Sequence, residues 1–472
     1  MGKKTFSRRD FLKLSGASAA LAASGLSLDG LLARAAAQAA TPAATAAASG
    51  EISFMGWGGQ PEDEGVRAAV TVFEQSNPSI TVDWIQIPTQ TTPDFTSAFL
   101  AQVAAGTAPD TAFVDATNYE TFGKKGLLMD ITDRIMSDPQ LGQKDYFIEP
   151  QEQSRCADDQ GRWHGIGACW VAPHLYYNAD MLDKAGIKPP GFKDDQIWSW
   201  NDFITYAQQL TVDSSGRHPT DAGFNKDDVV TYGVQWPFSN WTFIASAVVA
   251  NGGDYTANGK SGLDSDAAIQ AIQNLADLIY KYNVAPQDAI LTSLGMTNTQ
   301  MIDAGKLALA VDGSWALSWM NPSTVTHVTL GTGALPALAK PGSYIQSHFH
   351  AALSSTQNPD AAWQWVRFLA TPFYQEQFCK TGLWLPSQTS LMTPDAIKGW
   401  ITPGIHTDNY VDLLTDYMPK HGVTSRIPPG YTDAFTNFIT PAFDAINNGQ
   451  AAADVLPDAI KQANDAIAQA AT

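Results

Sequence analysis

The chain has 472 residues, 44% of them apolar, which is enough for two or three domains with sizeable cores. Its 28 basic and 47 acidic residues give a formal net charge of -19. A field of that sign repels phosphate backbones and anionic lipid surfaces, which argues against nucleic acid or an acidic membrane as a partner. Three cysteines are too few for a disulfide scaffold, whereas the 14 tryptophans exceed what core filling usually requires.

The N-terminal segment predicts export. A basic start precedes a mildly apolar stretch and small-residue cleavage motifs, the three-part layout of a bacterial export signal. Within it SRRDFLK, residues 7–13, resembles the twin-arginine signal. We therefore expect a signal peptide over 1–39, cleaved or kept as an anchor, a flexible leader over 40–49, and a periplasmic or extracellular mature protein. No cysteine precedes Cys156, so a lipid anchor on a mature N-terminal cysteine is not expected.

The first part of the mature chain alternates strands and helices. Strands are expected at 51–57, 80–87 and 111–114, with a helix after each of the first two, and this order favours an α/β sheet of mostly parallel strands. Ligands of such sheets bind outside the carboxyl ends of the strands. Trp57 and Asp115, which end the first strand and follow the third, are therefore expected at the mouth of one crevice.

The same alternation continues to the end of the chain. Further strand-like segments are expected at 163–170, 175–177, 232–236 and 307–311. Further helices are expected at 201–210, after the strand 232–236 as far as Ala250, at 266–282, after a turn over 312–315, and at 360–369 and 451–470. No fixed-period repeat is present, which argues against a solenoid or a propeller.

Nine stretches occur in an order typical of one family. They are ISFMGWGG, AQVAAGTAPDTAFV, GLLMDIT, GRWHGIG, LYYNADMLDKAGIKPP, WSWNDFITYAQQLT, ANGGD, MIDAGKLALAVDGSWAL and NPDAAWQWVRFLAT. Over nearly all of residues 50–470 the chain thereby resembles the solute-binding proteins of bacterial carbohydrate importers, the family that contains the maltose-binding protein. No single stretch is decisive, and the order carries the resemblance.

The resemblance implies a two-lobe periplasmic-binding-protein fold of the α/β class, with the lobes joined by several hinge crossings and the ligand cleft between them. By analogy, residues 50–165 with 346–388 form lobe 1, and residues 166–345 with 389–472 form lobe 2. Such a protein captures a sugar or oligosaccharide and delivers it to the permease subunits of an ABC importer in the membrane. We expect a monomer that needs no cofactor.

The candidate ligand-binding residues follow from the chemistry of a sugar ring. Its apolar face suits an aromatic plate, and its hydroxyls suit planar polar groups. Trp315 stands where the family presents a stacking tryptophan on a turn. The candidates are Trp57, Asp115, Asn118, Trp170, Trp241, Asp254, Trp315, Trp384 and Arg426. Each has a structural alternative: a tryptophan can pack in the core, Asp115 can cap a helix, and Asp254 can belong to a turn.

The sequence carries no recognisable catalytic motif. It has no H-E-x-x-H, Walker A loop, G-x-S-x-G or zinc-spaced set of cysteines and histidines. His348 and His350 share a strand face without an evident third metal ligand, and Cys156 and Cys169 flank a predicted hairpin, which leaves a disulfide open. We therefore expect a binding protein and no enzyme. A binder of a polyamine or a glycerol phosphate, and an exported glycoside hydrolase, are the alternatives.

Overall fold

A computed structural model describes residues 48–89, 92–147 and 151–470. The predicted signal peptide and nearly all of the predicted leader lie outside these residues. The chain divides into two compact units. Unit 1 comprises the chain up to Cys169 together with Ser347–Phe378, and unit 2 comprises Trp170–Gln346 together with Cys379–Thr472. Each unit is therefore built from segments that are far apart in the sequence.

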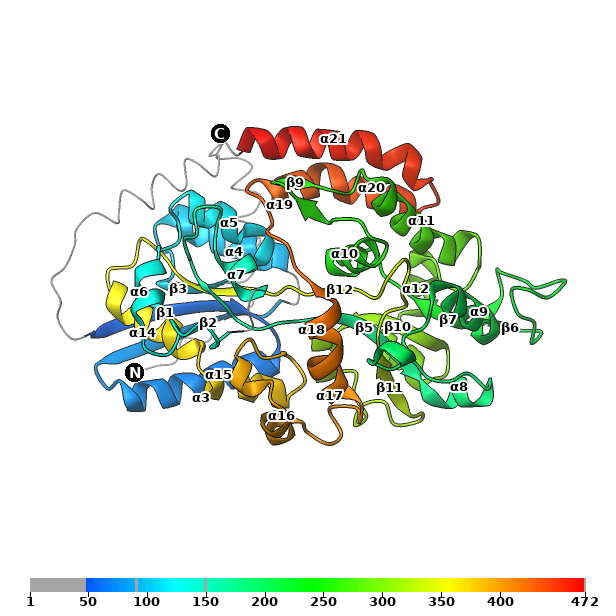
Figure 1. Cartoon of the computed structure of the whole chain (residues 1–472), viewed down its shortest axis with the longest axis horizontal. Helices are drawn as coiled ribbons and strands as arrows, with labels where there is room; N and C mark the ends of the chain where they lie inside the picture. Colours follow the sequence, from blue (N-terminus) through cyan, green and yellow to red (C-terminus); the bar gives the residue numbers. More distant parts are fainter. Residues whose placement is uncertain (1–47, 90–91, 148–150, 471–472) are drawn as a thin grey trace. The chain divides into compact units, whose positions relative to one another are not determined.

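Unit 1 contains a five-stranded sheet with the strand order β2-β1-β3-β13-β4. Strands β1, β2 and β3 are labelled in Figure 1. Strand β1 (Gly50–Trp57) pairs in parallel with β2 (Ile80–Ile87) and β3 (Thr111–Val114). Strand β13 (Phe349–Ala352) runs antiparallel to β3 and to β4 (Ile166–Gly167). The carboxyl ends of β1 and β3 therefore meet at one edge of the sheet, next to the start of β13.

The helices of unit 1 pack on this sheet through aromatic side chains. Phe54 of β1 and Phe73 of α3 both contact Trp365 of α14 edge-on, with ring centroids 5.3 and 5.0 Å apart. Phe99 of α4 stacks on Phe122 of α5. The helices are α3 (Gln60–Ser76), α4 (Thr92–Ala105), α5 (Ala116–Lys124), α6 (Thr132–Ser137), α7 (Gln151–Cys156), α14 (Pro359–Leu369) and α15 (Pro372–Lys380).

Unit 2 contains a second five-stranded sheet, with the order β11-β5-β10-β7-β6. Strand β10 (Leu307–Gly313) is central, parallel to β7 (Val229–Gln235) and antiparallel to β5 (Pro173–Asn178). Strands β11 (Leu330–Gly333) and β6 (Val212–Asp213) lie at the edges. Two-stranded sheets are formed by β12 (Ser343–Tyr344) with β14 (Gly422–Val423), and by β8 (Thr256–Ala257) with β9 (Lys260–Ser261).

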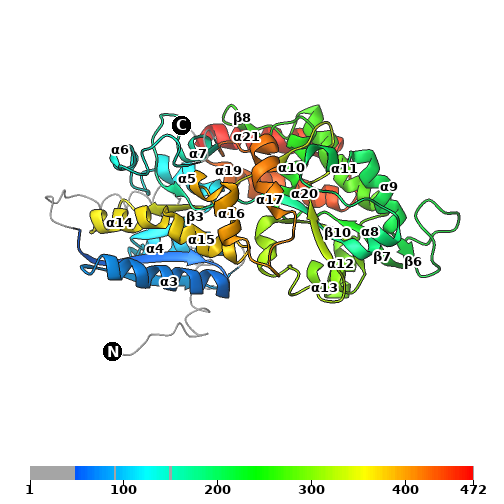
Figure 2. The same cartoon turned by 60° about the horizontal axis from the view of Figure 1, so that its bottom comes forward.

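The remaining helices belong to unit 2, and those from the end of the chain pack on helices from its middle. Figure 1 shows α20 and α21 beside α11, and they also contact one another. Figure 2 shows α16 and α17 from another side. The helices are α8 (Ala179–Lys184), α9 (Trp200–Leu210), α10 (Trp241–Ala250), α11 (Asp266–Tyr280), α12 (Asp288–Leu294), α13 (Asn298–Asp303), α16 (Pro394–Trp400), α17 (Tyr410–Asp412), α18 (Met418–His421), α19 (Tyr431–Ala434), α20 (Thr440–Asn447) and α21 (Ala452–Ala470).

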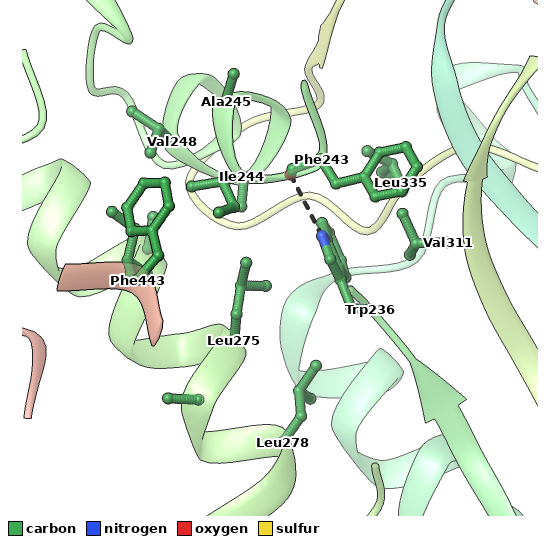
Figure 3. Packing of buried hydrophobic residues seen from close by; sticks show 14 of the residues in the cluster. Trp236, Phe243, Ile244, Ala245, Val248, Leu275, Leu278, Val311, Leu335 and Phe443 are labelled. Atoms are coloured by element: carbon green, nitrogen blue, oxygen red, sulfur yellow. Dashed lines mark hydrogen bonds between the residues drawn. The ribbon is translucent and has the colours of Figure 1, made fainter. Parts of the chain in front are cut away.

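The core of unit 2 is built around α10, which is buried from Thr242 to Ala250. Figure 3 shows side chains of α10, α11 and β10 converging there, together with Trp236. The Trp236 Nε1 group donates a hydrogen bond to the Phe243 backbone oxygen at 3.3 Å (Figure 3). The first turn of α10 is thereby anchored to the loop that follows β7.

Two local predictions from the sequence were wrong. Of the strand expected over 163–170, only Ile166–Gly167 is a strand, because the chain here joins the edge of a sheet and then leaves unit 1. The helix expected after the 312–315 turn is a short 3-10 turn, Ser314–Ser318. Both sheets also contain more antiparallel pairing than the expected mostly parallel arrangement, since strands from distant segments insert in the opposite direction.

Candidate ligand-binding residues in the two units

Trp57 ends β1 of unit 1 and is held by three aromatic neighbours. Its half-buried ring packs edge-on against Phe95, Phe113 and His348, with centroids 4.9, 5.1 and 4.8 Å apart. The next residue, Gly58, has a φ of +129°, and a Cβ there would lie 2.5 Å from the Glu62 Cδ. The turn after Trp57 therefore requires glycine at this position.

Asp115 and Asn118 lie at the neighbouring strand end, after β3. Asp115 is the N-cap of α5, and its Oδ1 accepts hydrogen bonds from the Thr117 backbone nitrogen at 2.9 Å and from the Thr117 hydroxyl at 2.5 Å. The capping alternative is therefore confirmed for Asp115. Asn118 is buried in the first turn of the same helix. Ligand contacts of these two residues remain predictions.

Three further titratable groups lie close to this end of unit 1. Glu62, which the sequence analysis did not single out, is buried, and its Oε2 accepts a hydrogen bond from the Gly59 nitrogen at 2.9 Å. Burial raises its pKa. Burial lowers the pKa of His348 to about 3 and lowers that of His350 well below its usual value, so both rings are neutral at pH 7. Within the described residues, no group of three side chains is placed to hold a metal ion.

Trp315 of unit 2 lies in the turn directly after β10. Its half-buried ring is parallel to that of Phe243 on α10, with an interplanar angle of 9° and centroids 6.0 Å apart. The turn is held by Ser314, which exchanges two hydrogen bonds with the Ala172 backbone at 3.0 and 3.1 Å. A Cβ on Gly313 would lie 2.1 Å from the Trp315 ring, so glycine lets the ring lie against the strand end. The indole is held in place with part of its surface in solvent.

Trp241 stands at the start of α10, and aromatic rings brace it as well. Its half-buried ring stacks on Tyr255, with centroids 5.2 Å apart, and meets Tyr344 edge-on at 5.5 Å. Trp241 and Trp315 therefore both lie beside the first turn of α10, Trp241 within it and Trp315 stacked on its Phe243.

Asp254 and Arg426 lie near Trp241, because hydrogen bonds join their neighbours in the sequence. The Tyr344 hydroxyl is 2.7 Å from the Ser425 hydroxyl, and the Thr256 hydroxyl donates to the Arg426 backbone oxygen at 2.9 Å. The side chains of Asp254 and Arg426 are exposed. The structure thus brings three predicted residues of unit 2, Trp241, Asp254 and Arg426, into one region.

Trp170 and Trp384 belong to unit 2, and both are buried. Their exposed fractions are 0% and 5%. Trp170 exchanges backbone hydrogen bonds of 2.8 and 3.0 Å with Leu385, the residue after Trp384. This packing favours the structural alternative for both rings, and a ligand role for either remains a prediction.

Asp312, one residue before the end of β10, is the polar group that the sequence analysis overlooked. It is half-buried, and its Oδ1 accepts a hydrogen bond from the Gly313 nitrogen at 2.8 Å. Burial, opposed by this hydrogen bond, raises its pKa to about 7. The quoted DGSW turn contained the residue, but the sequence does not show how far its side chain is buried.

The three cysteines are buried, and none of them forms a disulfide in the described structure. Burial raises the pKa of the Cys169 thiol to about 12 and raises that of Cys156 well above its usual value. The disulfide that the sequence left open between these two residues is therefore not formed, and both groups are protonated thiols at neutral pH.

Two family models match the chain. The model described as bacterial extracellular solute-binding protein matches residues 57–376, and the model of the twin-arginine translocation signal sequence matches residues 5–25. The second match confirms the export signal predicted from SRRDFLK. In the part of the chain that the structure describes, no helix is long and apolar enough to cross a membrane.

Several known proteins are similar to this chain. An arabinooligosaccharide-binding protein of Halalkalibacterium halodurans is 25% identical over 189 residues, which is 39% of this chain and 36% of that protein. An ABC substrate-binding protein from Listeria monocytogenes, solved with cycloalternan, has a TM-score of 0.71 at 18% identity, covering 89% of this chain and 98% of its own. UgpB from Mycobacterium tuberculosis, solved with glycerophosphocholine, has a TM-score of 0.70 at 18% identity, covering 90% and 100%.

These similarities confirm the predicted fold class, an α/β periplasmic-binding-protein fold. The family match extends over more than half of the chain, from the end of β1 to α15. The chain belongs to the family of bacterial extracellular solute-binding proteins and is exported by the twin-arginine route.

Proposed function

We propose that this protein captures a sugar or oligosaccharide outside the cytoplasmic membrane and delivers it to the permease subunits of an ABC importer, as a binding protein and not as an enzyme. One observation carries the proposal: each unit has a half-buried tryptophan close to the carboxyl end of a sheet strand. Trp57 is the last residue of β1 in unit 1, and Trp315 lies in the turn after β10 in unit 2. Each indole is braced by other aromatic rings. The flat face of an indole ring held in this way can stack on the apolar face of a sugar ring.

The energetics explain why the aromatic rings matter more than any one polar contact. A hydrogen bond to a neutral hydroxyl contributes only about 0.5–1.5 kcal/mol net, since water competes for it. An aromatic anchor that is excluded from water is worth roughly 2–4 kcal/mol when truncated. We expect the indoles to supply most of the affinity and the carboxylates and amides to set orientation and specificity.

The two units are proposed to act as the two lobes, with the expected boundaries 50–165 plus 346–388 and 166–345 plus 389–472. The chain passes between the units after Cys169, Gln346 and Phe378. Several crossings of this kind serve as a hinge in proteins that close on a ligand. A permease that makes different contacts with the loaded and empty states then distinguishes them.

The charges at the candidate positions favour a neutral or cationic solute. Asp115, Asp254, Glu62 and Asp312 are acidic, whereas Arg426 is the one cation among the predicted residues. A phosphate ester needs a basic cluster, so glycerol phosphate is disfavoured. An organic cation such as a polyamine is the second candidate, because carboxylates beside indole rings also suit cations.

A thermal-shift panel tests the proposal. The exported mature protein is heated with arabino-oligosaccharides, malto-oligosaccharides, cycloalternan, spermidine and glycerophosphocholine, one at a time. A ligand at a hundred times its dissociation constant stabilises the folded state by about 2.7 kcal/mol, which gives a measurable rise in melting temperature. We expect such a rise with at least one sugar. Stabilisation by spermidine or glycerophosphocholine alone would refute the sugar proposal.

A further inference from the structure

The carboxyl end of β10 brings a carboxylate and an indole together within four residues. Asp312 and Trp315 are both half-buried, and they flank Gly313 and Ser314, whose backbones are held by hydrogen bonds. The Tyr176 hydroxyl donates to the Gly313 backbone oxygen at 2.8 Å. The turn that carries both side chains is therefore held by hydrogen bonds to Tyr176 and to Ala172.

The Asp312 carboxylate retains most of its hydrogen-bonding capacity. An ionised carboxylate offers about four acceptor sites. The hydrogen bond that Asp312 accepts comes from the Gly313 nitrogen. Within the described part of the chain, no lysine, arginine or histidine lies within ion-pair distance of it. A buried charge without a counter-charge is costly, and a donor on a ligand would lower that cost.

The groups that face Asp312 from the neighbouring strands and helices carry no positive charge at pH 7. His174 lies directly opposite on β5, two residues before Tyr176. Burial lowers the pKa of His174 to about 4. Burial also raises the pKa of Tyr176 and of Tyr410, whose ring centroid is 5.9 Å from that of His174, well above the usual value. On the β7 side, Gln235 pairs with Ala310.

A second polar atom in this region lacks a hydrogen-bond partner. His174 is fully buried, and its Nδ1 donates to the Ala172 backbone oxygen at 3.0 Å. Its Nε2 has no partner in the described structure. Buried polar groups are nearly always satisfied by protein, water or ligand. The strand end therefore combines a carboxylate that has no counter-charge among the described residues with a buried ring nitrogen that has no partner there. Of the two, the half-buried Asp312 carboxylate is the group that suits a donor-bearing solute.

We propose that Asp312 is a specificity-determining ligand contact, in which its ionised carboxylate accepts hydrogen bonds from hydroxyls of a sugar ring that packs on Trp315. This inference rests on the proposed function and deepens it by assigning the polar partner of the indole. Acidic side chains that accept from hydroxyls make charge-assisted hydrogen bonds, which are stronger than neutral ones. Asp312 thereby discriminates hydroxyl donors from solutes that present only acceptors or negative charge.

The same contact makes binding depend on pH. Since the pKa of Asp312 is about 7, the carboxyl group is ionised in roughly nine molecules in ten at pH 8 and in roughly one in ten at pH 6. A solute that needs the ionised form is bound in proportion to that fraction. Affinity is therefore expected to fall about tenfold from pH 8 to pH 6.

Calorimetric titration tests the inference. Arabinotriose, maltotriose and glycerophosphocholine are titrated into the mature protein, into Asp312→Asn and into the control Asp264→Asn, an exposed carboxylate of unit 2. Asparagine keeps an oxygen for the Gly313 nitrogen but has no charge. We expect a sugar to bind about tenfold more tightly at pH 8 than at pH 6. We expect Asp312→Asn to weaken binding at pH 8 by on the order of 10- to 100-fold and to abolish the pH dependence, with Asp264→Asn unchanged.

The outcomes separate this inference from the proposed function. If a sugar binds equally well at pH 6 and pH 8 and Asp312→Asn does not change its affinity, the role of Asp312 is overturned. The proposed function as a sugar-binding protein then still holds. Glycerophosphocholine binding that Asp312→Asn weakens, without sugar binding, overturns the function and the hydroxyl contact together. If neither these three probes nor the other sugars of the thermal-shift panel bind, both are contradicted. Melting temperatures without ligand add an independent check: Asp312→Asn should melt higher than the wild type at pH 8, and a difference that does not shrink toward pH 4 contradicts an uncompensated carboxylate.

Discussion

At the scale of single residues, burial separates tryptophans that can meet a solute from those that hold the fold. Trp315 and Trp236 both lie near α10, yet Trp315 is half-buried whereas Trp236 is 5% exposed and donates a hydrogen bond to Phe243. A half-exposed ring loses water when a ligand covers it. A ring in the core contributes to stability in the presence or absence of a ligand.

We predict that alanine affects ligand binding at one of these positions and stability at the other. Trp315→Ala should weaken sugar binding by on the order of 30- to 1,000-fold, equivalent to roughly 2–4 kcal/mol, because it removes an aromatic anchor. Trp236→Ala should instead lower the free energy of unfolding by roughly 3–5 kcal/mol, because it empties part of the core. Calorimetric titration and urea unfolding of both variants measure this. Equal affinity with much reduced stability for Trp315→Ala would assign that ring to the core.

Buried histidines predict loss of stability in acid. Burial lowers the pKa of His174 and of His406 to about 4, so each must lose part of its stabilisation as pH falls from about 6.5 toward 4. We expect the free energy of unfolding to fall by roughly 2 kcal/mol per histidine between pH 7 and pH 4.5. Urea unfolding of the wild type, of His174→Gln and of the exposed control His327→Gln checks this. If the free energy of unfolding falls as much between pH 7 and pH 4.5 in His174→Gln as in the wild type, His174 does not contribute to the loss of stability.

At the scale of elements, the strand ends position the candidate residues, and glycine shapes them. Gly58 has a φ of +129°, and a Cβ there would meet Glu62 at 2.5 Å. Gly399, inside α16 (Pro394–Trp400), has no atom within 4 Å of a Cβ built on it. The two positions therefore allow a matched comparison of the same substitution.

We predict that Gly58→Ala destabilises unit 1 and that Gly399→Ala does not destabilise unit 2. The first change combines a strained backbone with a clash, costing on the order of 1–3 kcal/mol. The second should stabilise by about 0.4–1 kcal/mol, because alanine restricts the unfolded chain and suits a helix. Differential scanning calorimetry records both. An unchanged melting temperature for Gly58→Ala would show that the turn after β1 can relax.

The elements also show how far sequence reasoning reaches. The strands 80–87 and 111–114 match β2 and β3 at both ends, because alternating or buried apolar runs between turn residues are a strong local signal. The pairing of β13 with β3 joins residues more than 200 positions apart, and local pattern carries no information on it. The π-helical turns Leu413–Tyr417 and Phe435–Ile439 were likewise not predicted.

Some features of the candidate ligand-binding residues could be predicted from the sequence, and others could not. The positions of Trp57 and Trp315 at strand ends followed from the sequence, since both come directly at the end of apolar strands. The burial of Trp170, Glu62 and Asp312 did not, because exposure depends on what the rest of the chain packs against each residue. Polar groups whose chemistry depends on burial therefore become apparent only in three dimensions.

At the scale of the whole molecule, the export route and the buried thiols are consistent with each other. The twin-arginine route carries folded proteins, and all three cysteines are buried without forming a disulfide in the described structure. A chain that reaches an oxidising compartment already folded does not expose such thiols to exchange.

We predict that replacing Arg8 and Arg9 by lysine blocks export, because the paired arginines lie within the matched signal sequence. The measurement is the amount of mature protein outside the cytoplasmic membrane, with Lys3→Arg and Lys4→Arg as a control that changes basic residues outside the pair. Mass spectrometry of the exported wild type then checks cleavage near Ala39. Continued export of the twin-lysine variant would contradict the assigned route.

The central claim is that the two half-buried tryptophans Trp57 and Trp315 each contribute to sugar binding, and alanine substitution of both residues, singly and together, tests it most directly. The affinity for whichever sugar stabilises the mature protein is measured by calorimetry for the wild type, Trp57→Ala, Trp315→Ala and the double variant. The account predicts a loss of at least about tenfold in each single variant, equivalent to about 1.4 kcal/mol, and a larger loss in the double variant. Unchanged affinity in Trp57→Ala or in Trp315→Ala, with both variants folded, would contradict it.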